Sequence, residues 1–195
     1  RELLDNAGFE YIDFEDHQFE VDLQFDKAVP MLERLIALGE KHNKIFGVKL
    51  TNTFPVQIHN NELPGEQMYM SGKSLLPVTI GVAELLSAQF GERLPMSYSG
   101  GAVKQNIKAI FDCGIWPVTV ATTILKPGGY QRLQQMADSL EAMGVGEFKG
   151  MDVAALNKLA EDAITDAHHV KPAKLPASRK SNETVPLLDC YTAPC

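Results

Sequence analysis

The sequence predicts an α/β fold, and a (β/α) barrel fits its pattern best. Short β-forming runs alternate with amphipathic helical runs through residues 1–145. Repeated strand–helix units imply parallel strands joined by right-handed crossovers. About four such units are visible, whereas a complete barrel has eight. We therefore expect half of a (β/α)8 TIM barrel, followed by a short helix and an extended linker, with a doubly wound three-layer sheet as the alternative.

Four strands are expected from runs of aromatic and β-branched residues, at 9–14, 45–50, 94–98 and 116–122. Between the first two, apolar residues alternate strictly with polar ones from Phe19 to Phe25, which predicts a half-buried strand or an extended loop over the barrel rim. Residues 51–71 carry Pro, Asn and Gly, so we expect a polar loop there.

Helices are expected where apolar residues recur at helical spacing, over 26–44, 74–90, 103–112 and from about 129 to 143. Asp26 is the expected N-cap of the first helix, and Pro30 is tolerated in its first turn. Gly114 suits the left-handed residue that follows a helix end.

The character of the chain changes after residue 145. Residues 146–165 contain a segment with helical spacing, interpreted as a docking helix, and 166–189 have the composition of a linker. Residues 190–195 are interpreted as the start of a cysteine module. The chain begins at Arg1 without an initiator Met and stops at Cys195, so we expect a piece of a longer polypeptide.

Composition excludes several classes of protein. The net charge of −7 leaves no broad basic face for nucleic acid. No apolar run approaches the roughly 18 residues needed to cross a bilayer, and no secretory segment is visible, so we expect no membrane partner and a cytoplasmic location. Three cysteines are an odd number and do not suggest a disulfide framework.

Small and polar residues follow the expected strands. Ser99-Gly100-Gly101 precedes one helix, and Ala121-Thr122 ends the next strand. In barrel enzymes the loops after the last two strands often bind phosphate, because glycine lets backbone N–H groups approach the anion. Small residues also occur where a strand and a helix pack closely, so this alternative stays open for each motif.

Four motifs in order (LTNT, MSGK, SYSGG and VATT) resemble the last part of the dihydroorotate and dihydropyrimidine dehydrogenase barrels. The longer stretches FGVKLTNTFPV, LPGEQMYMSGKSL, ATTILKPGGY and DCYTAPC resemble the selenate reductase iron–sulfur subunits, a group of large oxidoreductases, over nearly the whole chain. The resemblance implies the C-terminal half of a dihydroorotate dehydrogenase-like barrel, strands five to eight, in a protein that moves electrons between clusters, flavin and NAD(P)H.

The resemblance also implies an FMN site. Ser99, Gly100 and Gly101 would bind the FMN phosphate, and Ala121 with Thr122 would complete that site. Gly72 matches a small residue close to the flavin, and Asn52 matches an Asn that contacts flavin or substrate. Lys49 could approach the isoalloxazine ring, where a cation stabilises reduced flavin; the alternative is an ordinary strand lysine that points to solvent.

One departure concerns the catalytic acid/base, which those dehydrogenases carry as Cys or Ser on a mobile loop. Residues 54–70 contain no Cys, Ser or Thr, and their candidates are His59, Glu62, Glu66 and Tyr69. The catalytic residue is therefore unknown, and the earlier half of the barrel could hold it. The alternative function is a non-catalytic barrel that docks the iron–sulfur module and partner subunits.

Metal chemistry is expected at the end of the chain. Cys190 and Cys195 resemble the opening of an iron–sulfur cysteine module, and thiolates are the usual ligands of a 4Fe–4S cluster. Two thiolates cannot complete such a cluster, so we expect it only in the longer polypeptide. Zinc bound with His168 and His169 is a competing reading. Asp13, Asp16 and His17 could form a metal site, or could cap a turn.

Overall fold

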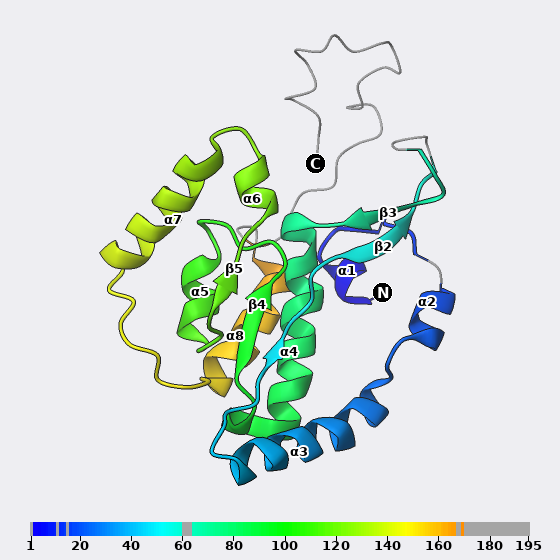
Figure 1. The fold of residues 1–195 in the computed structure, drawn as a ribbon. Coiled ribbons are helices and arrows are strands. Elements are labelled where there is room, and N and C mark those ends of the chain that lie inside the picture. The colour runs from blue at the N-terminus through cyan, green and yellow to red at the C-terminus, as the bar shows by residue number, and fades with distance from the viewer. Residues whose placement is uncertain (1, 11, 15, 60–63, 167–168, 170–195) are drawn as a thin grey trace, which may run out of the picture.

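The computed structural model describes residues 2–10, 12–14, 16–59, 64–166 and 169 (Figure 1). Its central sheet has three parallel strands in the order β1 (Val48–Lys49), β4 (Met96–Ser99) and β5 (Val118–Thr119). Lys49 is paired with Ser97, and Ser99 with Thr119. Each strand is followed by helices before the next begins, so the parallel βα pattern predicted from the sequence is confirmed.

The α-helices account for about half of the described chain. They are α1 (Glu2–Asn6), α2 (Asp16–Val21), α3 (Phe25–Lys41), α4 (Leu76–Phe90), α5 (Ile107–Asp112), α6 (Thr122–Leu125), α7 (Gly129–Ala142) and α8 (Val153–Thr165). Short 3-10 helices, Gly72–Leu75 and Gly91–Arg93, flank α4. The expected helices at 26–44, 74–90, 103–112 and 129–143 are confirmed, whereas α6 was not expected.

Helix α4 forms the centre of the core, because it is apolar on nearly every side. Leu76, Ile80 and Ala83 are fully buried, and α8 packs along α4 with Leu156 and Leu159. The continuous run Gly72–Arg93 is long and apolar enough to cross a membrane, since an 18-residue window within it has a mean hydropathy of 1.3, although the sequence was expected to hold no such run. Because 61% of that window is buried inside the protein, the run fits a core helix equally well.

The sheet has two different faces. Met96 and Tyr98 of β4 are buried against the helices, and Val118 of β5 packs on the same core. The alternate residues Lys49 and Thr119 are exposed on the opposite face, which no described helix covers. A barrel also places helices on one face of its strands only, so this arrangement fits a segment of a barrel wall.

The strand expected at 9–14 is wrong. Phe9 and Ile12 are buried, but the described residues of this segment form no strand and pair with no strand of the central sheet. They pack instead with Leu4 of α1, Val56 and Met70 in a second apolar cluster. The edges of the central sheet in the described chain are therefore β1 and β5.

The strand or rim loop expected between Phe19 and Phe25 is also wrong, because helix α2 occupies Asp16–Val21. Phe19 and Val21 are exposed on it. Helix α3 follows, and Gln24 rather than Asp26 is its N-cap. The amide of Gln24 donates to the carbonyl oxygens of Phe19 and Asp22, which orders the turn between the two helices.

The polar loop expected at 51–71 contains an antiparallel hairpin. Strand β2 (Phe54–Gln57) pairs with β3 (Gln67–Met70), with Phe54 opposite Met70 and Gln57 opposite Gln67. Val56 and Met70 are buried in the second cluster, which anchors the hairpin beside the carboxyl end of β1. The hairpin joins β1 to α4, so it stands next to the rim where the strand-end motifs meet (Figure 1).

The helix expected within 146–165 is present as α8 and shares one apolar core with α4 and α5. The division of the chain into separate domains stays a prediction. The expected linker at 166–189 lies outside the described residues except for Asp166 and His169, and the cysteine module at 190–195 lies wholly outside them.

Candidate functional site

A small cavity lies where the carboxyl ends of the three parallel strands meet. Its volume is about 80 Å³. Its lining comes from the segments after β1 and β3, the turn after β4 and the start of α6: Asn52, Thr53, Ser71, Gly72, Ser99, Gly100, Gly101, Ala102, Thr119, Val120, Ala121, Thr122 and Thr123. Seven of the eight predicted cofactor residues line this cavity, and only Lys49 does not.

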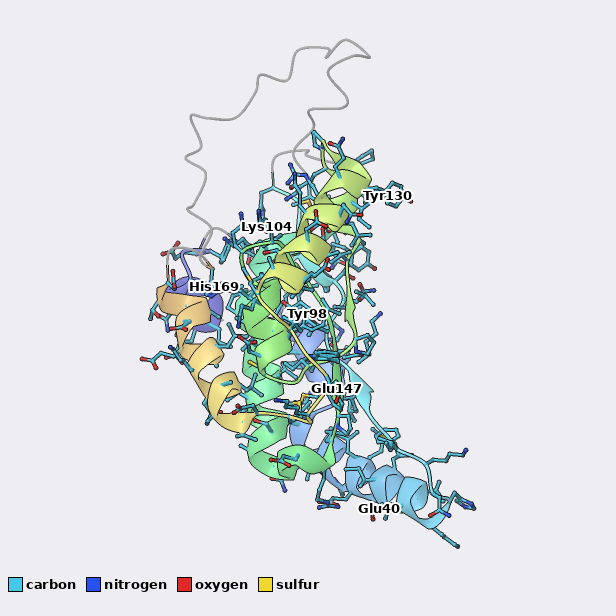
Figure 2. The ribbon with its side chains drawn as sticks, turned by 90° about the vertical axis from the view of Figure 1, so that its left-hand side faces the viewer. Glu40, Tyr98, Lys104, Tyr130, Glu147 and His169 are labelled. Carbon is cyan, nitrogen blue, oxygen red and sulfur yellow. The ribbon has the colours of Figure 1, made fainter. Side chains whose placement is uncertain are left out.

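The turn after β4 is held by donors that reach its carbonyl groups. The Thr51 hydroxyl donates to the carbonyl oxygen of Ser99 at 3.4 Å, and the Tyr98 hydroxyl donates to that of Gly100 at 2.6 Å. The Asn106 amide donates to the carbonyl oxygen of Gly101 at 3.1 Å. Tyr98, which Figure 2 labels, and Asn106 are both fully buried, so two of the three donors are fixed in the interior.

The direction of these carbonyl groups sets the direction of the amides. In a planar trans peptide the C=O and the following N–H point in opposite directions. The N–H groups of Gly100, Gly101 and Ala102 therefore point away from the three side chains that hold the turn. Among the described residues, none of these three N–H groups has a hydrogen-bond acceptor. Successive free amides around a hollow form a concave site that suits an anion.

Two glycines allow the turn to lie close to the segment before α4. Gly101 has a φ of +82°, and a Cβ there would lie 2.1 Å from the carbonyl oxygen of Gly72. Gly72 has a φ of +79°, and a Cβ there would lie 3.3 Å from Cγ2 of Thr122. A side chain at Gly101 would thus collide with backbone and force the two walls of the cavity apart.

Hydroxyl groups line the opposite wall. The Thr122 hydroxyl lies 3.3 Å from that of Ser71, and the Thr123 hydroxyl donates to the carbonyl oxygen of Ala102 at 2.8 Å. The Ser99 hydroxyl faces the side-chain oxygen of Asn52 at 3.5 Å. Ser71 and Thr122 keep hydrogen-bonding capacity for a bound group, because each hydroxyl can donate and accept.

Among the described residues, no charged side chain lines the cavity. Lys73 follows Gly72 directly, yet burial lowers the pKa of its ammonium, and the charge of Asp166 only partly opposes this shift. Lys49 is exposed on the open sheet face, where it is paired with Ser97. An anion in this cavity would therefore be held by neutral donors, and the described residues contain no cluster of His, Cys, Asp or Glu suited to a metal.

The candidate acid/base residues of the hairpin lie elsewhere. His59 is hydrogen-bonded to Asp13 at 2.8 Å, and both side chains are more than half exposed. Tyr69 is exposed, Glu66 does not line the cavity, and Glu62 lies outside the described residues. Asp13 thus pairs with a histidine, and His17 lies 3.8 Å from Glu20. No general acid or base is identified at the cavity among the described residues.

A larger hollow of about 740 Å³ lies at the amino end of β5, on the side of the sheet away from the strand-end motifs. It is bordered by Trp116, the end of α5 and the segment 143–154. Its side chains carry both signs of charge, including Lys108, Asp112 and Glu147. This mixture selects no single class of ligand, so the small strand-end cavity is the better candidate site despite its size.

Three residues of the site were not predicted from the sequence: Tyr98, Asn106 and Thr79, whose hydroxyl is hydrogen-bonded to that of Thr51. Tyr98 and Asn106 reach carbonyl groups two and five residues away, whereas Thr79 bonds to Thr51, 28 residues away in the sequence. Thr79 gave one usable signal, because it is a hydroxyl in the middle of an otherwise apolar helical run.

Comparisons with known proteins agree with this architecture. The family model described as "Oxidoreductase YgfK, N-terminal TIM-barrel domain" matches residues 1–171. Two curated relatives named "Putative oxidoreductase YgfK", from Escherichia coli strain K12 and from Escherichia coli O157:H7, are each 47% identical over 195 residues. The match covers 100% of this chain but 19% of the relatives' length. No solved structure matches the chain.

The barrel expected from the sequence is thereby confirmed, with a partial barrel present in the described residues. Both the family and the two relatives carry the word oxidoreductase in their names. The chain belongs to the family of oxidoreductase YgfK N-terminal TIM-barrel domains.

Proposed function

We propose that this barrel binds FMN and belongs to a longer oxidoreductase that carries flavin and iron–sulfur cofactors. The observation that supports the proposal most directly is the turn of Gly100, Gly101 and Ala102, whose three free N–H groups border a small cavity. A volume of about 80 Å³ suits a phosphate group. It is far below the roughly 300–1,000 Å³ of pockets that enclose a whole ligand. The phosphate end of the cofactor is therefore the part that this cavity would hold.

The residues of the cavity fit that role chemically. Gly100 and Gly101 would donate backbone N–H groups to the phosphate, while Ser71 and Thr122 would add hydroxyls. Ser99, Asn52, Gly72 and Ala121 would shape the walls. Bound FMN supplies hydride or single-electron transfer. Lys49 stays our candidate for the cation near the ring system, since it lies on the open sheet face that also carries Thr119 of the cavity wall.

The substrate and the catalytic acid/base have no assignment. We propose, from the family resemblance, that the longer enzyme moves electrons between clusters, flavin and NAD(P)H in the cytoplasm; the selenate reductase likeness stays part of this proposal. Cys190 and Cys195 are the proposed first ligands of a 4Fe–4S cluster whose other ligands would come from the longer polypeptide.

The remainder of that polypeptide is the proposed partner of this chain. Strand β1 is a free sheet edge in the described residues. The outer face of the neighbouring α3 bears Met31, which is 43% exposed, and Leu38, which is 52% exposed, one turn on either side of the half-buried Leu35. An open edge beside an apolar helix face favours packing of a further strand–helix unit. The chain spans 19% of the length of its curated relatives, which leaves ample sequence for such a unit.

The second candidate function is a non-catalytic barrel that docks an iron–sulfur module and partner subunits. The observation that favours it is that none of the described residues lining the cavity carries a charged side chain. A scaffold of this kind would retain the fold of the turn without binding flavin.

A binding comparison between FMN and riboflavin tests the proposal, since riboflavin lacks only the phosphate. Purified full-length polypeptide should show the visible absorption bands of oxidised flavin and should prefer FMN. The replacement Ala121→Asp places a carboxylate at the cavity wall. It should raise the dissociation constant of FMN by about tenfold or more, because the carboxylate repels the phosphate. The matched Ala121→Asn has the same shape without the charge and should retain FMN. Equal affinity for FMN and riboflavin in the unmodified protein would refute the phosphate site and favour the scaffold.

A further inference from the structure

Two hydroxyl side chains are buried in helix α4 and behave differently. Ser87 is 3% exposed, and its hydroxyl donates to the carbonyl oxygen of Glu84 at 2.9 Å, inside its own helix. Such a bond to the preceding turn is how a buried Ser or Thr in a helix is ordinarily satisfied. Thr79 is 0% exposed, and its hydroxyl instead reaches out of the helix to the hydroxyl of Thr51.

The bonding around Thr51 fixes which hydroxyl donates. The Thr51 hydroxyl lies 3.4 Å from the carbonyl oxygen of Ser99, which can only accept. A hydroxyl has a single hydrogen, so Thr51 must accept from Thr79 while it donates to Ser99. The three groups therefore form a directed chain from Thr79 through Thr51 to the Ser99 carbonyl group.

This chain ends at the peptide that presents the first N–H of the anion turn. Because the Ser99 carbonyl oxygen points toward Thr51, the N–H of Gly100 points the opposite way. The contact is close: a Cβ on Gly100 would lie 2.8 Å from the Thr79 hydroxyl oxygen and 3.2 Å from that of Thr51. The hydroxyl pair thus lies directly behind the turn.

We propose that Thr79 is a positioning residue for the anion pocket, acting through Thr51 on the Ser99–Gly100 peptide. The inference rests on the proposed phosphate site. Without the Thr79 hydroxyl, the Thr51 hydroxyl loses the bond that fixes its rotation, and its own bond to Ser99 weakens because linked hydrogen bonds strengthen one another. The Gly100 N–H is then free to turn from the position that faces a bound anion.

Five variants of the full-length polypeptide test this role, one of them Thr51→Val alone. Thr79→Val keeps the shape of the side chain and removes the hydroxyl. It should therefore raise the dissociation constant of FMN by about tenfold and change that of riboflavin by no more than about twofold. Thr79→Ser keeps the hydroxyl and should restore FMN binding. Ser87→Ala removes the other buried hydroxyl of the same helix and should leave the dissociation constants of FMN and riboflavin unchanged. Thr51→Val combined with Thr79→Val should weaken FMN binding no more than either replacement alone, since both break the same chain of hydrogen bonds.

An increase in the dissociation constants of FMN and riboflavin by the same factor in Thr79→Val would overturn the inference, because it would show a general loss of structure. Unchanged FMN binding in Thr79→Val would overturn it as well, while the phosphate site itself would stand. The FMN-to-riboflavin ratio separates these results from poor folding.

A second measurement does not depend on flavin. Inorganic phosphate should slow amide hydrogen exchange in the peptide that contains Ser99–Ala102, and Thr79→Val should abolish this protection whereas Ser87→Ala should not. Protection by phosphate without binding of FMN would refute the flavin proposal and keep the positioning role. A protein that binds neither FMN nor phosphate would overturn both proposals together.

Discussion

Gly101 lies against Gly72 with no room for a side chain between them, since a Cβ on Gly101 would be 2.1 Å from the Gly72 carbonyl oxygen. This contact joins the turn after β4 to the segment before α4. Both backbones have positive φ values, +82° and +79°. The anion pocket therefore depends on two glycines that come from different βα units.

Replacement of Gly101 by Ala should disrupt this contact. We expect a loss of about 3 kcal/mol or more in the free energy of unfolding, from the strained backbone together with the collision, and loss of FMN binding. The control is Gly144→Ala, because Gly144 also has a positive φ, +64°, but no atom lies within 4 Å of its Cβ position. That control should lower the free energy of unfolding by about 1 kcal/mol. Urea unfolding of both variants measures the difference, and equal losses would show that the collision is relieved by small movements.

The buried thiol of Cys113 should make stability fall at high pH. Burial raises its pKa to about 12 from an ordinary value of 9.0, with Asp112 and Asp152 adding to the shift. Between these two values the unfolded chain loses its thiol proton while the folded chain keeps it, so rising pH favours unfolding. Below the lower value both states are protonated, and the effect of pH disappears.

The expected loss from this thiol is about 1.4 kcal/mol for each pH unit inside that window. Other groups titrate there as well, so the informative quantity is the difference between the unmodified protein and Cys113→Ala. The free energy of unfolding should fall more steeply with pH in the unmodified protein. Parallel slopes would mean that the thiol is accessible to water in the folded state.

The core helices could be predicted from the sequence because their apolar spacing reflects burial directly. Leu32 and Ile36 of α3 and Ile80 of α4 are buried at the positions that the spacing indicates. The strand at Phe9–Phe14 failed for a different reason. Phe9 and Ile12 favour strands and are buried, but a strand also needs a neighbour to pair with, and propensity does not supply one.

The hairpin at Phe54–Met70 was missed because Pro55 and the Asn- and Gly-containing tip indicate a loop. Pro55 lies in β2 opposite Tyr69, and a two-stranded ribbon tolerates proline since each strand has an unpaired side. The anion turn was found because glycines before a helix carry a local signal. Tyr98, Asn106 and Thr79 were not found, because no sequence pattern shows that Tyr98 and Asn106 donate to the turn or that Thr79 bonds to Thr51.

The exposed face of α3 should become buried in the full-length polypeptide if a further βα unit packs there. Leu38→Glu would then place a carboxylate in an apolar contact and lower the unfolding temperature by about 3 °C or more. Tyr130→Glu is the control, because Tyr130 of α7 is 78% exposed and lies outside the proposed contact (Figure 2). Scanning calorimetry compares the two. Equal, small shifts would contradict the proposed packing surface.

The cysteines at the end of the chain should differ from Cys113 in their effect on iron. If Cys190 and Cys195 are cluster ligands, Cys190→Ser and Cys195→Ser should each remove about four iron atoms per full-length polypeptide purified without air, because one missing thiolate destabilises a whole cubane cluster. Cys113→Ala should retain its iron, since Cys113 is buried in the barrel core. Iron and acid-labile sulfide assays measure the outcome. Unchanged iron in both serine variants would assign the clusters to other cysteines and leave this pair without a metal role.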